Sequence, residues 1–340
     1  MNADRPGAVP IIGEAPAFLE TLEHVSRAAP LLRPVLVVGE RGTGKELIAS
    51  RLHYLSGRWE RPLIKVNCAA LTESLLESEL FGHESGAFTG ATRTHIGQFE
   101  QSSGGTLVLD ELGTIPLRMQ EKILRVIEYG EFRRVGGSET LISDARVVGV
   151  TNEDLPRLAA RGRFRPDLLD RLAFDVIHVP PLRARPEDIL TLAYHFAVNI
   201  TSELKRPFFP GFSDEATTEL LAASWAGNVR ELKNTVERSV YRASDPSSPI
   251  TDVIFAPFTS PFGEIAAPPG ETEPEPSQEA ASGLGAALSY PLDFKALVAN
   301  LERDLLEKAL TRSQHNQRIA AELLGLSYHQ LRGLVRKHRT

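Results

Sequence analysis

Two hydrophobic patterns alternate through about the first half of the chain. Short continuous apolar runs, typical of strands buried on both faces, are separated by segments with a helical period. The helical segment Pro116–Glu128, for example, places its apolar residues on one stripe. The runs that predict strands are Val35–Val38, Leu63–Val66, Thr106–Leu109, Val147–Val150 and Asp175–Val179. The alternation predicts an α/β domain with a mostly parallel sheet at residues 1–179.

Only helical patterns follow this α/β region. Ile189–Thr201, Ser213–Ser224 and Asn228–Arg242 each predict a helix. Ser213 stands before acidic residues, as a helix N-cap commonly does. We therefore expect a small helical subdomain, residues 180–256, packed on the sheet domain.

The composition changes at residues 257–291, which contain seven prolines and five glutamates. Such a segment buries too little apolar surface to offset the entropy of ordering, so it predicts a disordered linker. Three more helices are predicted after it, at Leu292–Leu310, Gln317–Leu324 and from Ser327 to about His338. Residues 292–340 therefore predict a small all-α domain.

Charge and cysteine content add two constraints. The net charge of −6 argues by itself against nucleic-acid binding, but the last 28 residues carry +4 when histidines are neutral. Charge gathered at one end of a chain is more informative than the total. Cys68 is the only cysteine, and no apolar run is long enough to span a membrane. We expect a cytoplasmic protein without membrane insertion.

The last two predicted helices have the form of a helix-turn-helix. Gly325 stands in the turn, and each helix has one apolar face directed inward. The outward positions suit a DNA major groove and adjacent phosphates, and the alternative is a helical bundle with a charged surface. The predicted DNA-binding residues are Ser327, which can also cap the helix, Tyr328, His329, Gln330, Arg332, Arg336 and Lys337.

A glycine-rich segment connects the first predicted strand to a helix at Leu47–Leu55. Glycines let several backbone N–H groups point at one phosphate, and the helix adds its positive end. Lys45 would then neutralise the β and γ phosphates of ATP. A glycine-rich turn without a ligand is the alternative, and the strand-loop-helix context favours ATP. The predicted binding residues are Gly39, Glu40, Arg41, Gly42, Thr43, Gly44, Lys45 and Glu46.

Two carboxylates, Asp110 and Glu111, end another predicted strand. They should lie at the carboxyl edge of the sheet, where open α/β sheets bind ligands. Asp110 would orient Mg²⁺ or its water shell, and Glu111 would polarise the attacking water as a general base. Glu46 stands where Ser or Thr usually holds Mg²⁺, so Asp110, water and phosphate oxygens must supply more of the metal shell. Taken alone, Asp110 and Glu111 could belong to a solvated turn. Together with the Lys45 loop, they favour ATP hydrolysis over simple ATP binding.

These elements resemble an AAA+ P-loop ATPase, and a further motif narrows the resemblance. Gly86-Ala-Phe-Thr-Gly-Ala91 is the signature of sigma-54-dependent bacterial enhancer-binding proteins, which are AAA+ transcriptional activators. Phe81–Gly90, Leu182–Ile189 and Trp225–Leu232 are similar to further stretches of that family. The likeness covers about residues 10–255 and resumes in the C-terminal helices, which resemble a Fis-type helix-turn-helix.

Within this family, the phosphate loop, Arg51–Ser56 and Trp59 are most similar to the branch that activates the phage-shock-protein operon. Glu46 is also the residue that the family uses at its position. The resemblance implies control by phage-shock protein A, a negative regulator docking near Trp59. Because only about ten residues precede Ile11, we expect no sensing domain before the ATPase.

The resemblance also implies roles for residues that spacing alone does not identify. Asn67 would hold Glu111 inactive until the partner is engaged, Asn152 would sense the γ-phosphate, and Arg230 would be a second sensor. Arg165 and Arg171 match arginine fingers given to a neighbouring subunit, which implies a homo-oligomer, with a hexamer expected. An exposed, hinged loop would contact sigma-54, and its residues are Gly86, Ala87, Phe88, Thr89, Gly90 and Ala91.

The implied function is activation of transcription by an oligomeric ring. The ring would bind enhancer DNA, hydrolyse ATP and remodel the closed complex of sigma-54 RNA polymerase into an open complex. One alternative is an ATP-responsive DNA-binding repressor, against which the hydrolytic residues argue. Another is an AAA+ ATPase that remodels a different protein, against which the Gly86–Ala91 motif argues.

Overall fold

The structure is a computed structural model that describes residues 11–255, 294–313 and 316–338. The predicted linker, residues 257–291, lies outside the described residues. The chain divides into two compact units, Met1–Phe258 and Thr259–Thr340. Within the described residues, none of the helices has the length and apolarity needed to cross a membrane.

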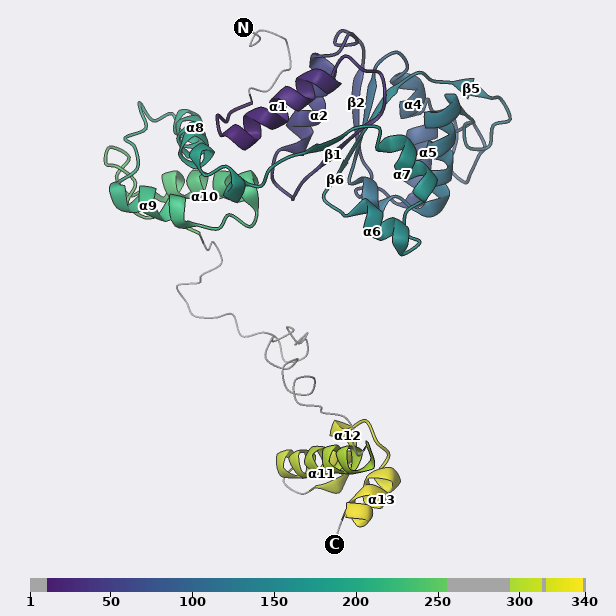
Figure 1. Cartoon of the computed structure of the whole chain (residues 1–340), viewed down its shortest axis with the longest axis vertical. Coiled ribbons are helices and arrows are strands. Elements are labelled where there is room, and N and C mark those ends of the chain that lie inside the picture. The colour runs from purple at the N-terminus through teal and green to yellow at the C-terminus, as the bar shows by residue number, and fades with distance from the viewer. Residues whose placement is uncertain (1–10, 256–293, 314–315, 339–340) are drawn as a thin grey trace. The chain divides into compact units, whose positions relative to one another are not determined.

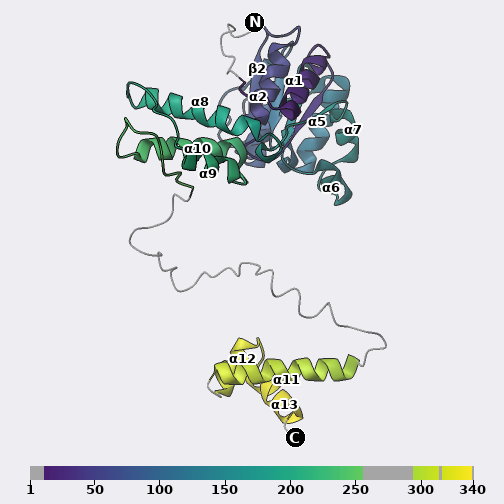
Figure 2. The ribbon, with the colours of Figure 1, turned by 60° about the vertical axis from the view of Figure 1, so that its left-hand side comes forward.

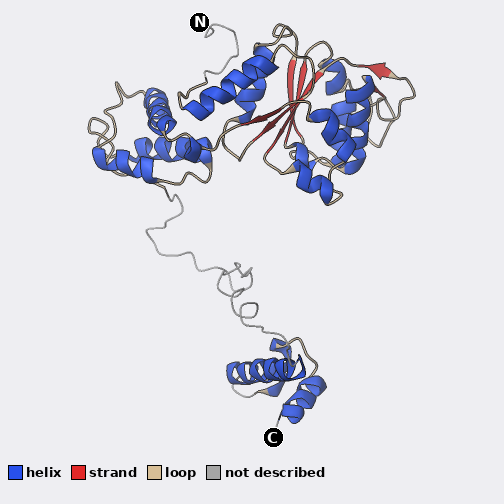
Figure 3. Ribbon diagram, in the orientation of Figure 1, coloured by secondary structure: helices blue, strands red, loops and turns tan. Residues whose placement is uncertain are grey.

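A five-stranded parallel sheet forms the centre of the first unit, and all five predicted strands are present (Figure 3). The strands are β1 (Val35–Val38), β2 (Leu63–Asn67), β3 (Thr106–Asp110), β6 (Arg146–Thr151) and β7 (Val176–His178). Their order is β2-β3-β6-β1-β7, and each neighbouring pair is parallel. All five carboxyl ends therefore lie at one edge of the sheet. The predicted α/β fold with a parallel sheet is confirmed.

Helices cover both faces of this sheet, which explains the continuous apolar runs (Figures 1 and 2). On one face, α1 (Pro16–Ala28) and α2 (Lys45–Tyr54) pack with Val108 of β3 in one core cluster. Leu107 and Leu109 of the same strand pack in a second cluster on the other face. The helices in that second cluster are α3 (Glu73–Phe81), α4 (Gln98–Gln101), α5 (Leu117–Tyr129), α6 (Leu155–Ala160) and α7 (Pro166–Leu172).

Three of the elements that were not predicted are too brief to show a period. Two of them, β4 (Glu131–Phe132) and β5 (Leu141–Ile142), form an antiparallel hairpin after α5. The third, a 3₁₀ turn at Leu112–Thr114, follows the two carboxylates of β3. The helix after the phosphate loop also begins at Lys45 rather than at Leu47, so Lys45 and Glu46 lie in its first turn.

The helical subdomain contains α8 (Glu187–Glu203), α9 (Asp214–Ala222) and α10 (Asn228–Arg242), after a 3₁₀ turn at Leu182–Ala184. Trp225 is buried in its core with residues such as Leu192 and Leu232. The predicted N-cap is confirmed, since Ser213 Oγ accepts a hydrogen bond from the Ala216 N–H at 3.2 Å.

The second unit contains α11 (Phe294–Arg312), α12 (Gln317–Leu323) and α13 (Tyr328–His338), close to the predicted ranges. Its core is small and apolar, and it draws on all three helices. The buried residues are Leu306, Ala309, Ala320, Ala321 and Leu331. This arrangement confirms the predicted all-α domain.

Candidate functional site

The predicted phosphate loop lies at the carboxyl end of β1 and leads directly into α2. Gly42 and Gly44 have φ of 77° and 96°, the left-handed region that favours glycine. Thr43 Oγ1 and Lys45 Nζ each donate a hydrogen bond to the carbonyl oxygen of Glu40, both at 2.9 Å. The loop is therefore curled on itself, with the amino end of α2 directed at its centre.

A cleft of about 560 Å³ opens between this loop, the end of β3 and the helical subdomain. Burial lowers the pKa of Lys45, and the charges of Asp110 and Glu111 act in the opposite direction. The cleft thus brings the half-buried ammonium group of Lys45 together with the carboxylates of Asp110 and Glu111. Its lining residues are Arg41, Gly42, Gly44, Lys45, Glu46, Leu47, Asp110, Glu111, Phe196, Val229, Arg230, Lys233 and Asn234.

Glu111 has an unusual backbone conformation for a residue with a side chain. Its φ is 55° and its ψ is 42°, in the left-handed region. Thr114 stabilises this turn, since its N–H and its hydroxyl donate to the Glu111 carbonyl at 3.0 and 2.8 Å. Asp110 Oδ1 accepts the Glu111 N–H at 2.9 Å. Strain of this kind costs about 1–3 kcal/mol and is concentrated at functional sites.

The two predicted asparagines lie at the same edge of the sheet as these carboxylates. Asn67 ends β2 and is paired in register with Asp110. Its Oδ1 accepts the Ala69 N–H at 2.9 Å, and within the described residues no hydrogen bond joins its side chain to Glu111. Asn152 directly follows β6, whose last residue, Thr151, pairs with Val38 of β1. Their proposed control and sensor roles remain predictions.

The two predicted arginine fingers lie away from the lining of the cleft in their own subunit. Arg165 precedes α7 and pairs with Asp167 at 2.7 Å. Arg171, on α7, pairs with Glu128 at 2.6 Å, and its side chain is 56% exposed. Both guanidinium groups are on the surface, where a neighbouring molecule can reach them.

Sequence reasoning missed the contacts by which the helical subdomain holds the phosphate loop. Arg183 Nη1 donates to Glu40 Oε2 at 2.8 Å, and Asn228 Nδ2 donates to the same oxygen at 3.1 Å. Hydrogen bonds from Arg183 and Asn228 lower the pKa of Glu40 to about 2. The buried Arg185 donates to the carbonyl of Thr43 at 3.0 Å. The only signal in the sequence for these contacts was that Arg183 and Arg185 fall in the Leu182–Ile189 stretch, which is similar to the family.

Backbone contacts bring the same two parts still closer together. The N–H of Arg230 approaches the carbonyl oxygen of Gly42 at 3.3 Å. A Cβ added at Gly42 would lie 2.2 Å from the carbonyl oxygen of Gly227. Arg230, predicted from the resemblance alone, therefore lies on the cleft, at the start of α10.

The predicted contact loop, Gly86–Ala91, is exposed at its tip. Phe88 is 47% exposed, whereas Ala91 is buried at the base of the loop. The Gly86 N–H donates to the Ala91 carbonyl at 2.8 Å, which closes the loop. The Phe88 ring contacts the His83 ring edge-on, with centroids 4.9 Å apart.

A second loop, between β4 and β5, supports the first. Arg134 pairs with Glu84 at 2.8 Å and with Glu100 at 2.9 Å. The backbone of Gly136 lies so close to Ala87 that an added Cβ would be 2.7 Å from the Ala87 Cβ. The two loops therefore form one contiguous surface.

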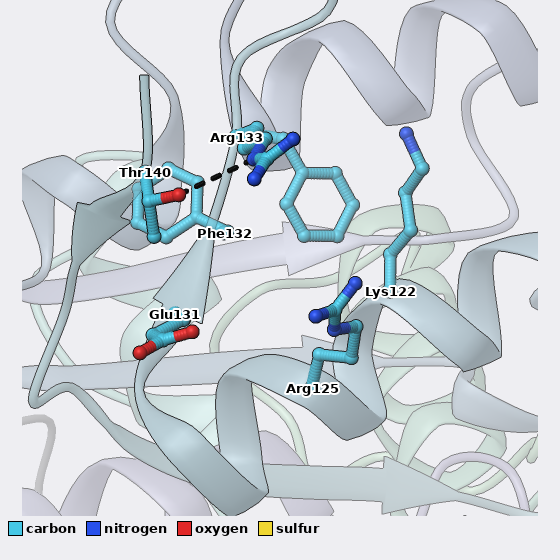
Figure 4. Close-up of a pocket in the computed structure, with 7 residues that line it drawn as sticks. Lys122, Arg125, Glu131, Phe132, Arg133 and Thr140 are labelled. Atoms are coloured by element: carbon cyan, nitrogen blue, oxygen red, sulfur yellow. Dashed lines mark hydrogen bonds between the residues drawn. The ribbon is translucent and has the colours of Figure 1, made fainter. Parts of the chain in front are cut away.

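A smaller cavity, about 250 Å³, lies between α5 and the β4–β5 hairpin (Figure 4). Lys122 and Arg125 reach it from α5, and Arg133 donates to Thr140 Oγ1 at 3.2 Å across its rim. Its lining is basic but has no phosphate loop and only one carboxylate, Glu131. The nucleotide site is therefore assigned to the larger cleft.

The predicted DNA-binding residues lie on or just before α13 in the second unit. Tyr328, His329, Arg332 and Arg336 are exposed, as expected. Ser327 and Gln330 instead bind each other as a helix cap, with Ser327 Oγ 2.9 Å from Gln330 Oε1. Lys337 Nζ donates to Glu302 Oε2 on α11 at 2.7 Å. The predicted capping role of Ser327 is confirmed, whereas Gln330 and Lys337, predicted to contact DNA, are engaged by the cap and by the ion pair.

Three family models match the chain. The Sigma-54 interaction domain matches residues 11–178, the AAA+ ATPase lid domain matches residues 183–254, and the bacterial regulatory protein, Fis family, matches residues 297–333. The first of these covers about half of the chain and contains the phosphate loop, both carboxylates and the Gly86–Ala91 loop.

Known relatives agree with these matches. The chain is 54% identical over 329 residues to the Psp operon transcriptional activator of Escherichia coli (strain K12), covering 97% of this chain and 98% of that protein. It is 49% identical over 244 residues to the Nif-specific regulatory protein of Azospirillum brasilense, covering 71% of this chain and 39% of that one.

A solved structure has the same fold. The crystal structure of NtrX from Brucella abortus in complex with ATP has a TM-score of 0.67 and 30% sequence identity, covering 97% of this chain and 69% of that chain. The chain therefore belongs to the sigma-54-dependent transcriptional activators of the AAA+ ATPase class.

Proposed function

We propose that the chain hydrolyses ATP in the cleft beside Lys45 and uses the energy to remodel sigma-54 RNA polymerase from a closed into an open complex. The convergence of Lys45, Asp110 and Glu111 on one cleft supports this proposal most directly. The exposed Phe88 loop on the same domain supplies a surface for the polymerase.

The donor set of the cleft fits a nucleotide-bound Mg²⁺. Among the described residues, no group of three or more His, Cys, Asp or Glu side chains could hold a metal ion alone. Mg²⁺ in nucleotide sites needs only one or two carboxylates, together with water and phosphate oxygens. Asp110 would hold it, and when bound it would neutralise charge on the phosphates.

The protein's own groups then have distinct tasks. Lys45 and the backbone N–H groups of the loop bind the phosphates, and Glu111 accepts a proton from the attacking water. Arg165 and Arg171 act on the nucleotide of a neighbouring subunit, for which their exposed positions are suited. Hydrolysis would then require assembly, which we propose to be a hexameric ring.

The second unit would act as a tether to enhancer DNA. The exposed Arg332 and Arg336 on α13 would supply the contacts, while the Ser327–Gln330 cap holds the start of that helix. Similarity to the Psp operon activator supports control of the same operon in the cytoplasm. It also supports regulation by phage-shock protein A at Trp59, which is 41% exposed.

Two variants test the coupling between hydrolysis and remodelling. We expect Lys45→Ala to lose both ATPase activity and sigma-54 open-complex formation, because the phosphates lose their cation. We expect Thr89→Ala to keep substantial hydrolysis but to lose open complexes. Open complexes formed by Thr89→Ala would contradict the loop assignment. DNA binding with no hydrolysis by the wild type would instead favour a repressor.

A further inference from the structure

One buried carboxylate has no part in the chemistry proposed above. Asp188 lies in the first turn of α8, and its side chain is 1% exposed. Its Oδ2 lies 4.0 Å from Nη1 of Arg185, whose side chain is 2% exposed. Within the described residues, this oxygen has no hydrogen-bond partner, so Arg185 is the group that balances its charge. Removing either member of such a pair leaves the other as an unpaired buried charge.

Asp188 holds the segment that leads into α1. Its Oδ1 accepts hydrogen bonds from the N–H groups of Glu14 and Ala15 at 2.6 and 2.9 Å. The backbone of Gly13 also approaches the carboxylate, since an added Cβ would lie 2.6 Å from Oδ2. Asp188 therefore fastens the start of α1 to the helical subdomain.

Arg185 extends from the same ion pair to the phosphate loop. Its Nη2 donates a hydrogen bond to the Thr43 carbonyl oxygen at 3.0 Å. Its guanidinium carbon lies 4.6 Å from the centroid of the Phe18 ring on α1. Burial lowers the pKa of Arg185, and the charge of Asp188 acts in the opposite direction. The guanidinium group thus contacts α1 and the phosphate loop and is paired with Asp188.

The Thr43 carbonyl belongs to the same peptide unit as the N–H of Gly44. In a trans peptide the C=O and the N–H point in opposite directions, so a donor on the carbonyl also fixes the direction of the N–H. Gly44 lines the cleft and has a φ of 96°. Because glycine adopts many backbone conformations, this peptide could rotate if nothing held it. The hydrogen bond from Arg185 therefore fixes one N–H of the loop that would bind phosphate.

We propose that Asp188 is a positioning residue for nucleotide binding, and that it acts through Arg185 on the Thr43–Gly44 peptide. Its charge holds the guanidinium group against the Thr43 carbonyl, and its other oxygen secures the start of α1. This role rests on the nucleotide site proposed above.

ADP affinity and thermal stability of the full chain test this role in Asp188→Asn, in Arg185→Met and in the double variant. Asparagine keeps an oxygen for the two N–H groups but loses the charge that holds Arg185. We expect each single variant to bind ADP about fivefold or more weakly in isothermal titration calorimetry. Each also leaves one buried charge unpaired, so its melting temperature should fall.

The double variant separates positioning from folding. Because it contains neither charge, its melting temperature should recover most of the loss seen in Arg185→Met. Its ADP affinity should stay within about twofold of that of Arg185→Met, since the Thr43 carbonyl still lacks its donor. If a single variant does not fold, the ADP affinity of the double variant decides.

Arg146→Met is the matched control. Arg146 is also a buried arginine, and it donates to the carbonyls of Ala28 and Ala29 at 2.9 and 2.8 Å. It begins β6, at the edge of the sheet opposite the cleft. We expect Arg146→Met to lower the melting temperature and to leave ADP affinity within about twofold of the wild type.

Three results would overturn the role of Asp188 alone. They are single variants that bind ADP as tightly as the wild type, a double variant whose affinity recovers together with its stability, and an equal loss of affinity in Arg146→Met. A wild type that binds no ADP would overturn the nucleotide site together with this role.

Discussion

The ATP cleft and the Gly86–Ala91 loop belong to the same domain but are held in opposite ways. At the cleft, Gly42 fits so closely against Gly227 that a Cβ would lie 2.2 Å from a backbone oxygen. At Gly86 and Gly90, a Cβ would meet no heavy atom within 4 Å. The cleft is fixed by the helical subdomain, whereas the tip of the loop has free space around it.

This difference fits the tasks that we propose for the two regions. Groups that stabilise developing charge are most effective when they are fixed before the reaction begins. A segment that changes position needs few buried contacts, so that its movement costs little. Phe88, exposed and supported mainly by His83, has that character. Arg185, buried and bound to the Thr43 carbonyl, has the opposite one.

The largest expected effect is on catalysis at the fixed region. Glu111→Gln keeps the size of the residue but removes the carboxylate that we propose as the general base. We expect kcat for ATP hydrolysis to fall about 10²- to 10⁴-fold, with nucleotide affinity nearly unchanged. Steady-state ATPase assays together with ADP binding would measure both. Near-normal turnover in Glu111→Gln would remove this carboxylate from the mechanism.

Two glycine variants compare the regions directly. Gly42 and Gly90 have φ of 77° and 102°, so alanine is strained at both positions. Only at Gly42 does the new Cβ also collide with backbone. The φ strain alone is about 1–2 kcal/mol, and the collision adds to it. We expect Gly42→Ala to weaken nucleotide binding by about tenfold or more.

Gly90→Ala is the matched control for that variant. We expect its ATP hydrolysis to stay within about twofold of the wild type, because the strain falls on an exposed loop away from the cleft. Isothermal titration with ADP and a turnover assay separate the two variants. Equal losses of nucleotide binding in Gly42→Ala and Gly90→Ala would mean that φ strain, rather than contact with the helical subdomain, lowers the nucleotide affinity.

The local patterns of the sequence predicted the elements but not the contacts between distant ones. Apolar runs located all five strands because both sheet faces are covered. The Arg183–Glu40 contact joins residues 143 positions apart, and no period or spacing encodes it. The β4–β5 hairpin has strands of two residues, too short for any alternation. Lys337 looked free for a phosphate because its partner, Glu302, comes from another helix.

The smallest expected effect is on the link between the helical subdomain and the phosphate loop. The pKa of Glu40 falls from 4.5 to about 2 because Arg183 and Asn228 donate hydrogen bonds to its carboxylate. A lowered pKa in the folded state stabilises the fold above pH 4.5, and this contribution is lost as the pH falls toward about 2. Glu40→Gln should therefore lower the free energy of unfolding at pH 7. Because the pair is exposed and screened, the loss should be no more than about 1 kcal/mol.

The difference in the free energy of unfolding between Glu40→Gln and the wild type should narrow as the pH is lowered from 4.5 toward about 2. Urea unfolding at several pH values would measure this difference. The double variant, Arg183→Met with Glu40→Gln, should have nearly the same free energy of unfolding as either single variant. A difference that persists unchanged at low pH would mean that the Glu40 side chain stabilises the loop by packing rather than by charge. In that case the helical subdomain is held to the phosphate loop by Gly42, Arg185 and Asn228, and the Glu40–Arg183 pair contributes only to its orientation.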